Sequence, residues 1–181
     1  MRPAPSHTLR RVDTGQETLT ELEVLVGFDD DLATESTRLV NRIRGPLATI
    51  YPMLEKPIGP RLHHPAALEL LITYGGPDGL RVATADQLLA TAKPLAPRMA
   101  GRLVKAIKNA LDVQTVVVPG TIAASTVLPH LARSLRSVHN QRKQVAVQVE
   151  EILHAHPLAR GPGLKARLRD QDQRTDPAGD R

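Results

Sequence analysis

The chain has 181 residues, a net charge of +5 at pH 7 and a sequence pI of about 10.0, with one Phe, two Tyr, no Trp and no Cys. The lack of cysteine excludes disulfides and thiolate metal sites and favours a reducing cytoplasm. No apolar run approaches the ~20 residues that span a bilayer, and residues 1–11 lack the apolar region of a secretory signal. The basic charge favours anionic partners, nucleic acid first, unless it serves solubility alone.

After an expected disordered arm over residues 1–13, the first predicted element is a long helix over residues 14–56. Proline removes an N–H and clashes with the preceding turn, so Pro46 predicts a kink or break near Arg44–Gly45. Apolar side chains recur at alternating spacings of three and four, with Asp29 and Ser36 in two gaps, which is typical of a helix packed along a long partner. These apolar residues are Leu22, Leu25, Leu32, Leu39, Ile43 and Ile50.

A small helical cluster is predicted over residues 57–115. Residues 57–63 are expected to be a connector because they contain two prolines and a glycine. A helix is predicted from Pro65, a favoured first residue, to Gly75-Gly76. Residues 77–82 are expected to form a turn.

Two more helices are predicted in this cluster. Thr84 is a plausible N-cap for a helix that runs to about Ala92. Pro97 is expected to begin an amphipathic helix that runs to about Leu111. Its predicted apolar face consists of Met99, Leu103, Ile107, Ala110 and Leu111.

The second long helix is predicted over residues 116–158. Val116–Val118 could be extended, but a lone strand has no partner, so we interpret it as a connector. Thr121 is a possible cap, Pro129 is expected to delay the helix by a turn, and Pro157 is expected to end it. An unbroken three–four repeat follows, formed by Leu128, Leu131, Leu135, Val138, Arg142, Val145, Val149 and Ile152.

Together these elements predict an all-α fold. The two long helices are expected to form an antiparallel coiled-coil hairpin with the small cluster between them, followed by a disordered tail over residues 159–181. Parallel self-association through the same seams is the alternative. In that case Arg142, Asp29 and Ser36 would help to set the register.

Candidate catalytic chemistry is weak in this sequence. Asp29, Asp30 and Asp31 are adjacent on a helix, so they point about 100° apart and do not converge on a cation; a solvated face is the expected role. His63-His64 and the pair His154 and His156 lack the i, i+4 spacing of a zinc helix. We interpret His64 as lying on the N-cap side of a helix and His154 as lying near a helix C-terminus. We therefore expect no catalytic residue, metal or cofactor.

Basic side chains occur in three groups on the predicted helices. Each group alone is most often a solvated face, but three on one scaffold favour contacts to phosphates, which fix position and carry little sequence information. The candidate nucleic-acid-binding residues are Arg38, Asn41, Arg42 and Arg44 on the first long helix, Arg98, Arg102 and Lys105 in the cluster, and Arg133 and Arg136 on the second long helix.

Several stretches between residues 8 and 158 resemble one protein family. They are Thr8-Leu-Arg-Arg-Val-Asp13, Thr37-Arg-Leu-Val-Asn-Arg-Ile-Arg-Gly45, His64-Pro-Ala66, Ala96-Pro-Arg-Met-Ala100, Gln114-Thr-Val-Val-Val-Pro-Gly-Thr121 and Ala155-His-Pro-Leu158. They resemble the segment after the catalytic core in DEDD-type insertion-sequence transposases, the Piv/MooV-like, bridge-RNA-guided recombinases of the insertion sequence one-ten type.

The resemblance implies a role in DNA transposition. In that family an N-terminal RuvC-like domain supplies four acidic metal ligands and a C-terminal domain supplies a serine nucleophile. This chain departs from the family pattern at both ends, so none of those positions has a counterpart here, and Pro46 stands where a helix-compatible residue is expected. We therefore expect a truncated transposase that covers the coiled-coil middle region and does not cleave DNA by itself.

The expected function is nucleic-acid contact and dimerisation in the cytoplasm. The expected partners are DNA, structured RNA and a second chain, either a copy of this one or a full-length transposase. The alternative is a helical coiled-coil interaction protein that pairs with or inhibits a full-length transposase. Salt separates the two, because phosphate contacts weaken steeply with salt and a Leu/Val seam does not.

Overall fold

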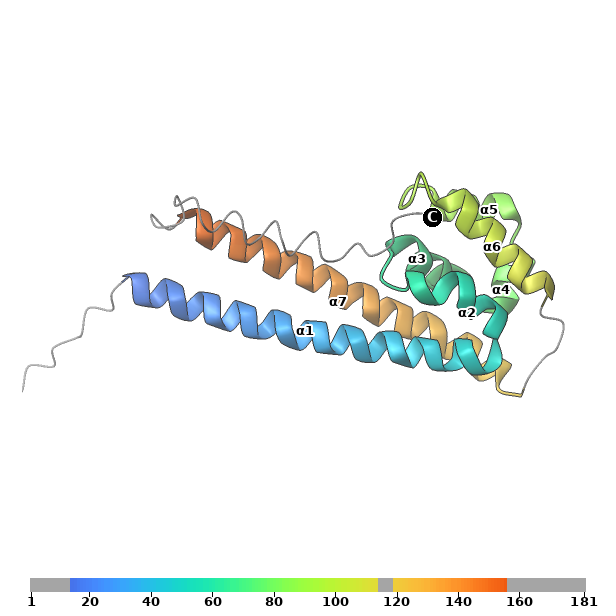
Figure 1. Cartoon of the computed structure of the whole chain (residues 1–181), viewed down its shortest axis with the longest axis horizontal. Coiled ribbons are helices and arrows are strands. Elements are labelled where there is room, and N and C mark those ends of the chain that lie inside the picture. The colour runs from blue at the N-terminus through green and yellow to red at the C-terminus, as the bar shows by residue number, and fades with distance from the viewer. Residues whose placement is uncertain (1–13, 114–118, 156–181) are drawn as a thin grey trace, which may run out of the picture. The chain divides into compact units, whose positions relative to one another are not determined.

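The computed structural model describes residues 14–113 and 119–155, and every regular element in these ranges is a helix. The predicted all-α class is confirmed. The two long helices are α1 (Thr14–Ile50) and α7 (Thr121–Ala155), and the short helices α2–α6 lie between them in sequence (Figure 1). The predicted arm over 1–13, the connector at Val116–Val118, the stop at Pro157 and the tail over 159–181 lie outside the described residues.

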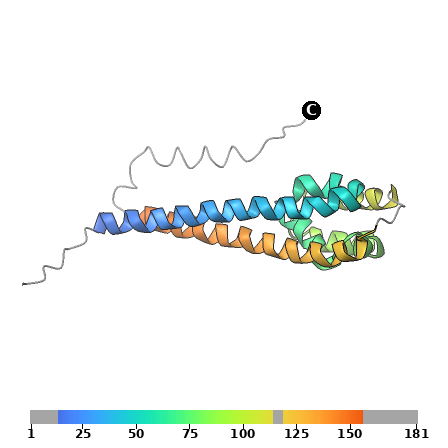
Figure 2. The same ribbon diagram turned by 90° about the horizontal axis from the view of Figure 1, so that it is seen from below.

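The chain divides into two compact units. One is Asp29–Lys143, and the other combines the described parts of Met1–Phe28 and Gln144–Arg181. Within Asp29–Lys143, α1 and α7 run antiparallel, because Asp29, Ser36 and Tyr51 bond in turn to Arg142, His139 and Thr121. Figures 1 and 2 both show these stretches side by side. The antiparallel pairing is confirmed, and it forms within one chain.

Helix α1 continues through Pro46 to Ile50, so the predicted break is wrong. It ends before Tyr51, whose dihedrals (φ −133°, ψ 56°) are not helical. A residue that precedes proline is disfavoured in the α region, and Tyr51 precedes Pro52. The chain ends α1 at this second proline and starts α2 (Pro52–Ile58) with the same residue.

The expected connector at 57–63 is mostly helical, because α2 is followed by the 3₁₀ turn η1 (Gly59–Arg61). The predicted helix from Pro65 is confirmed as α3 (Pro65–Tyr74). Its N-cap is His64, whose Nδ1 accepts the Ala66 N–H at 3.2 Å. Gly75 follows with φ 81°, a conformation that glycine adopts without strain.

The expected turn over 77–82 is instead a short helix, α4 (Pro77–Val82). Its stability depends on a residue far away in sequence, because Lys108 Nζ donates to the carbonyls of Leu80 (3.2 Å), Arg81 (3.1 Å) and Ala83. A cation at a helix C-terminus satisfies free carbonyls and interacts favourably with the helix dipole. Sequence patterns around residues 77–82 do not contain this information.

Helix α5 (Ala85–Ala92) begins as predicted after Thr84. Thr84 Oγ1 accepts the Gln87 N–H at 3.2 Å, and Gln87 Oε1 accepts the Thr84 N–H at 2.9 Å, which is a complete capping box. Helix α6 (Ala100–Val113) begins three residues after Pro97, so that predicted start is wrong.

Helix α7 begins at Thr121, directly after Gly120 (φ 97°), and Pro129 lies inside it. The predicted delay at Pro129 is therefore wrong, and Thr121 is the first helical residue rather than the cap.

The core of the unit Asp29–Lys143 is almost entirely aliphatic. It is formed by contacts of α6 with α2, α4 and α5 and of α3 with α4 and α5, and its fully buried residues include Ile43, Leu47, Leu54, Leu71, Leu88 and Ile107.

Candidate nucleic-acid interface

Two of the nine predicted nucleic-acid-binding residues are held by partners within the fold. Arg44 Nη2 donates to the Gly59 carbonyl at 3.3 Å, and its Nε lies 3.7 Å from Glu55 Oε1. Arg136 on α7 forms an ion pair with Glu69 on α3. A phosphate would have to compete with these partners, so both cations are weaker candidates than their exposure alone suggests.

Helix α1 presents an exposed polar row formed by Arg38, Asn41 and Arg42. The Arg38 side chain is 71% exposed, and its contact with Glu35 is long at 3.9 Å. Arg42 lies four residues further along and has no ion-pair partner among the described residues. Residues at this spacing share a helix face, so Arg38 and Arg42 can reach neighbouring phosphates.

A second basic row lies on and just before α6. Leu103, Val104, Ile107 and Leu111 are buried on the inner face of this helix, where it packs on α2 and α5. The opposite face carries Arg102 and Lys105, and Arg98 precedes the helix. All three are exposed, and within the described part of the chain none has a hydrogen-bond or ion-pair partner. The α6 row is the densest group of free cations that the predicted residues form.

The structure does not bring all nine predicted residues onto one surface. Arg133 lies between the seam residues Leu131 and Leu135, and Asn41 lies between Leu39 and Ile43. Such positions point away from the partner helix. Because α1 and α7 pack together within Asp29–Lys143, Arg133 and Asn41 face opposite directions.

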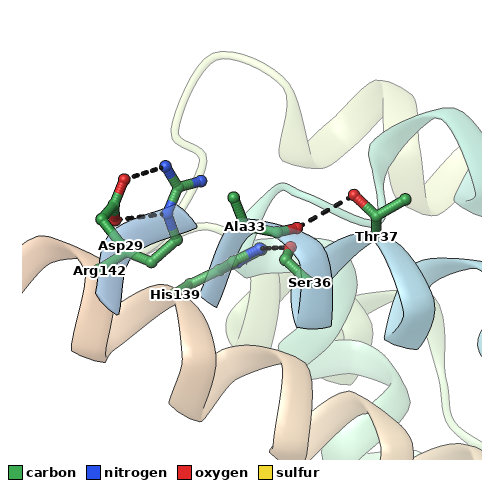
Figure 3. A network of polar contacts seen from close by, with 6 residues as sticks. All are labelled: Asp29, Ala33, Ser36, Thr37, His139 and Arg142. Carbon is green, nitrogen blue, oxygen red and sulfur yellow. Dashed lines mark hydrogen bonds and ion pairs between the residues drawn. The ribbon is translucent and has the colours of Figure 1, made fainter. Parts of the chain in front are cut away.

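A polar network between α1 and α7 was not predicted. Arg142 makes a bidentate ion pair with Asp29, with Nε–Oδ1 and Nη2–Oδ2 distances of 2.8 Å each (Figure 3). A second contact lies seven residues after Asp29 on α1 and three residues before Arg142 on α7, where Ser36 Oγ lies 3.2 Å from His139 Nε2. The expected solvated role of Asp29 is therefore wrong, whereas Asp30 and Asp31 are exposed. The clue in the sequence is that each apolar seam contains polar residues, which antiparallel pairing brings together.

The titration of these groups follows from their surroundings. The hydrogen bonds from Arg142 hold the pKa of Asp29 below its usual value, against the effect of partial burial. Burial lowers the pKa of His139, and the charges of His63, Arg142 and Lys143 lower it further. The His63 ring stacks on His139 with centroids 5.7 Å apart. These three cationic neighbours disfavour a further positive charge on His139.

The other histidines of the predicted pairs have structural roles. His64 caps α3, and the His154 ring nitrogen Nδ1 lies 2.7 Å from the Glu150 carbonyl oxygen near the end of α7. His156 lies outside the described residues. Across residues 14–113 and 119–155, no group of three or more histidine or acidic side chains is placed to hold a metal ion. No helix in these ranges is both long enough and apolar enough to cross a membrane.

Comparison with known proteins relates the chain to insertion elements. It is 51% identical over 154 residues to the uncharacterized 43.6 kDa protein of insertion element IS110 from Streptomyces coelicolor, a match of 85% of this chain and 38% of that protein. It is 28% identical over 150 residues to the uncharacterized 42 kDa protein of insertion element IS900 from Mycobacterium paratuberculosis, a match of 83% and 37% respectively. The chain thus spans under two fifths of these curated relatives and is homologous to insertion-element proteins. No family model and no solved structure matches it.

Proposed function

We propose that this chain is a nucleic-acid-contacting helical segment of an insertion-sequence transposase, with a role in DNA transposition. Homology to two insertion-element proteins supports the transposition role. The residue-level resemblance extends the proposal to DEDD-type, bridge-RNA-guided recombinases, with DNA and structured RNA as partners in the cytoplasm.

The observation that carries the binding proposal is the α6 row. Arg98, Arg102 and Lys105 are exposed and unpaired within the described residues, whereas Arg44, Arg136 and Lys108 are occupied by bonds within the fold. Free cations on one helical surface release counterions when they meet phosphates, which favours binding without sequence specificity. The α1 row of Arg38 and Arg42 supplies a second point of contact.

Charge-removal variants test this proposal. The full chain is titrated against labelled structured RNA and duplex DNA, as wild type and with Arg98, Arg102 and Lys105 changed to Ala. A control replaces Lys56 and Lys93, exposed cations outside both rows, so it removes two charges where the triple variant removes three. We expect the triple variant to bind at least about tenfold more weakly and the control to change little. Equal loss per charge removed would show that net charge alone drives binding, and no binding by wild type would exclude the proposal.

A second candidate function is pairing with another chain, either a copy of this one or a full-length transposase. It is favoured by apolar side chains left exposed on the first part of α1, namely Leu19, Val24, Val26 and Phe28. Leu19 and Val26 are seven residues apart, so they lie on the same side of α1, next to its seam of apolar residues. Apolar residues beside such a seam are typical of helices that pack in bundles of more than two. Sedimentation of wild type and of Val26→Lys tests this candidate. A dimer that persists in high salt and is lost in the variant supports it, and a monomeric wild type excludes it.

A further inference from the structure

A shallow groove runs between α5 and α6 beside the α6 basic row. It has a volume of about 310 Å³ and a mostly apolar surface, to which Ala85, Leu89 and Val104 contribute. Small-molecule pockets begin at roughly this size. The groove therefore has room for a planar ring but not for a helix.

Gly101 keeps part of this groove open. It lies inside α6, where glycine costs roughly 1 kcal/mol relative to alanine. A Cβ placed on Gly101 would have no atom within 4 Å, so no packing contact in the described fold requires a glycine here. Because Gly101 has no side chain, a ligand in the groove can approach the backbone of α6.

The groove's polar edges carry both kinds of hydrogen-bonding group and a free cation. Asn109 and Lys105 lie on the α6 side and Asp86 on the α5 side, and all three are exposed. Arg102 follows Gly101 in sequence. Like Lys105, it belongs to the α6 row, which lies beside the groove. A nucleotide combines the complementary features, because it has an apolar ring face, a hydrogen-bonding edge and an anionic phosphate.

We propose that this groove binds an unpaired nucleotide, with its base against Gly101 and Val104 and its phosphate at Arg102 and Lys105. This inference rests on the proposed function. It adds that the chain binds a nucleic acid with a bulge or loop more tightly than a perfect duplex. The surface of the groove is aliphatic, so the base gains less than it would by stacking on an aromatic ring. Phosphate contacts therefore still dominate affinity, and the groove supplies discrimination.

The test compares two RNA probes bound to the full chain, a perfect duplex and the same duplex with one unpaired adenosine. We expect wild type to favour the bulged probe by about fivefold, which corresponds to about 1 kcal/mol. Gly101→Leu fills the groove and has a higher helix propensity, so the fold is retained. It is expected to abolish the preference and leave duplex affinity unchanged. Ala106→Leu, on the exposed face of α6 outside the groove lining, is the matched control.

The outcomes separate this inference from the proposed function. Binding of both probes with equal affinity by wild type, or a preference that survives Gly101→Leu, overturns the nucleotide site and leaves phosphate binding intact. Loss of the preference in Ala106→Leu as well also overturns it. A change of oligomer size in Gly101→Leu, with the probe preference unchanged, would show that a second copy occupies the groove. Absence of salt-dependent binding to either probe would remove the proposed function itself.

Discussion

Asp29 and Arg142 form a two-bond ion pair inside the seam of the antiparallel helices. Each side chain lies in a series that is otherwise mainly apolar, so parallel pairing of each helix with its own copy would place like charges near each other. Pairing α1 with α7 joins opposite charges instead, and Ser36 lies beside His139 further along the same seam. We infer that these polar positions select the pairing of α1 with α7 over homotypic pairing, a recognised role of polar seam residues.

Removing one partner of this ion pair is expected to lower the free energy of unfolding only slightly, but by more than the same change at an exposed aspartate. The side chains of Arg142 and Asp29 are 41% and 33% exposed, so solvent screens their attraction. We expect Asp29→Asn to lower the free energy of unfolding by about 0.5–1 kcal/mol, measured by urea denaturation. Asp31→Asn, on the exposed surface, is the control. If Asp29→Asn costs the same when Arg142 is already Gln, the two side chains are not energetically coupled.

His139 is expected to make the fold sensitive to mild acid. Its pKa is lowered in the folded chain, mainly by burial, so the unfolded chain binds a proton more readily. Its contribution to stability is complete above the unfolded-state pKa of about 6.5 and is lost as pH falls below that value. Asp29 also has a lowered pKa, but its contribution falls only near and below pH 3.8, the ordinary value for aspartate.

Thermal unfolding measured between about pH 7.5 and 5 therefore reports on His139 rather than Asp29. Wild type is expected to lose a few degrees more in melting temperature over this range than His139→Gln, which can still hydrogen-bond to Ser36. His154→Gln, exposed near the end of α7, serves as the reference for removing a histidine. Equal pH dependence in wild type and His139→Gln would show that another group controls acid stability.

At the scale of elements, both long helices contain a proline that does not end them. Pro46 lies in α1 and Pro129 in α7, and each removes one helical hydrogen bond. Packing between long helices stabilises the backbone on both sides of the proline, because most helical stability in proteins comes from tertiary contacts. The prolines therefore lower stability without setting the helix boundaries.

Pro46→Ala is accordingly expected to stabilise the chain. Alanine restores the N–H that can bond to the Arg42 carbonyl and removes the ring clash, a difference of up to about 3 kcal/mol in a helix interior. Urea denaturation measures the change. Gly45→Ala, at a site with no atom within 4 Å of the added Cβ, gives the scale of a pure propensity gain, about 1 kcal/mol. A Pro46→Ala variant no more stable than wild type would mean that the neighbouring structure has adapted to proline.

Local signals predicted some elements well and failed at others for a physical reason. The N-cap at Thr84 and the helix from Pro65 were predicted because the residues that define them lie within one turn. Helix α4 was missed because Lys108 caps it from a different helix. The ion pairs of Arg44 with Glu55 and of Arg136 with Glu69 cannot be identified from spacing alone, because the partners lie on different elements. Whether any of the nine predicted residues binds nucleic acid stays a prediction.

At the scale of the molecule, two groups of basic side chains have different surroundings. One group stabilises the fold: Arg142 joins the long helices, Arg136 joins α7 to α3, Arg44 joins α1 to the segment after it, and Lys108 caps α4. The other group, on the α6 row and the α1 row, remains exposed. The bonded cations hold the helices in place. The exposed rows extend from these helices, so the spacing of their charges is set by the fold.

The most direct test of this account is the salt dependence of nucleic-acid binding. Each phosphate contact contributes about −0.9 to the slope of log K against log salt for duplex DNA. Removing Arg98, Arg102 and Lys105 together is expected to make that slope shallower by about 2–3, while Lys56→Ala with Lys93→Ala leaves it unchanged. An unchanged slope in the triple variant would contradict the account, because it would show that the α6 row does not contact phosphates.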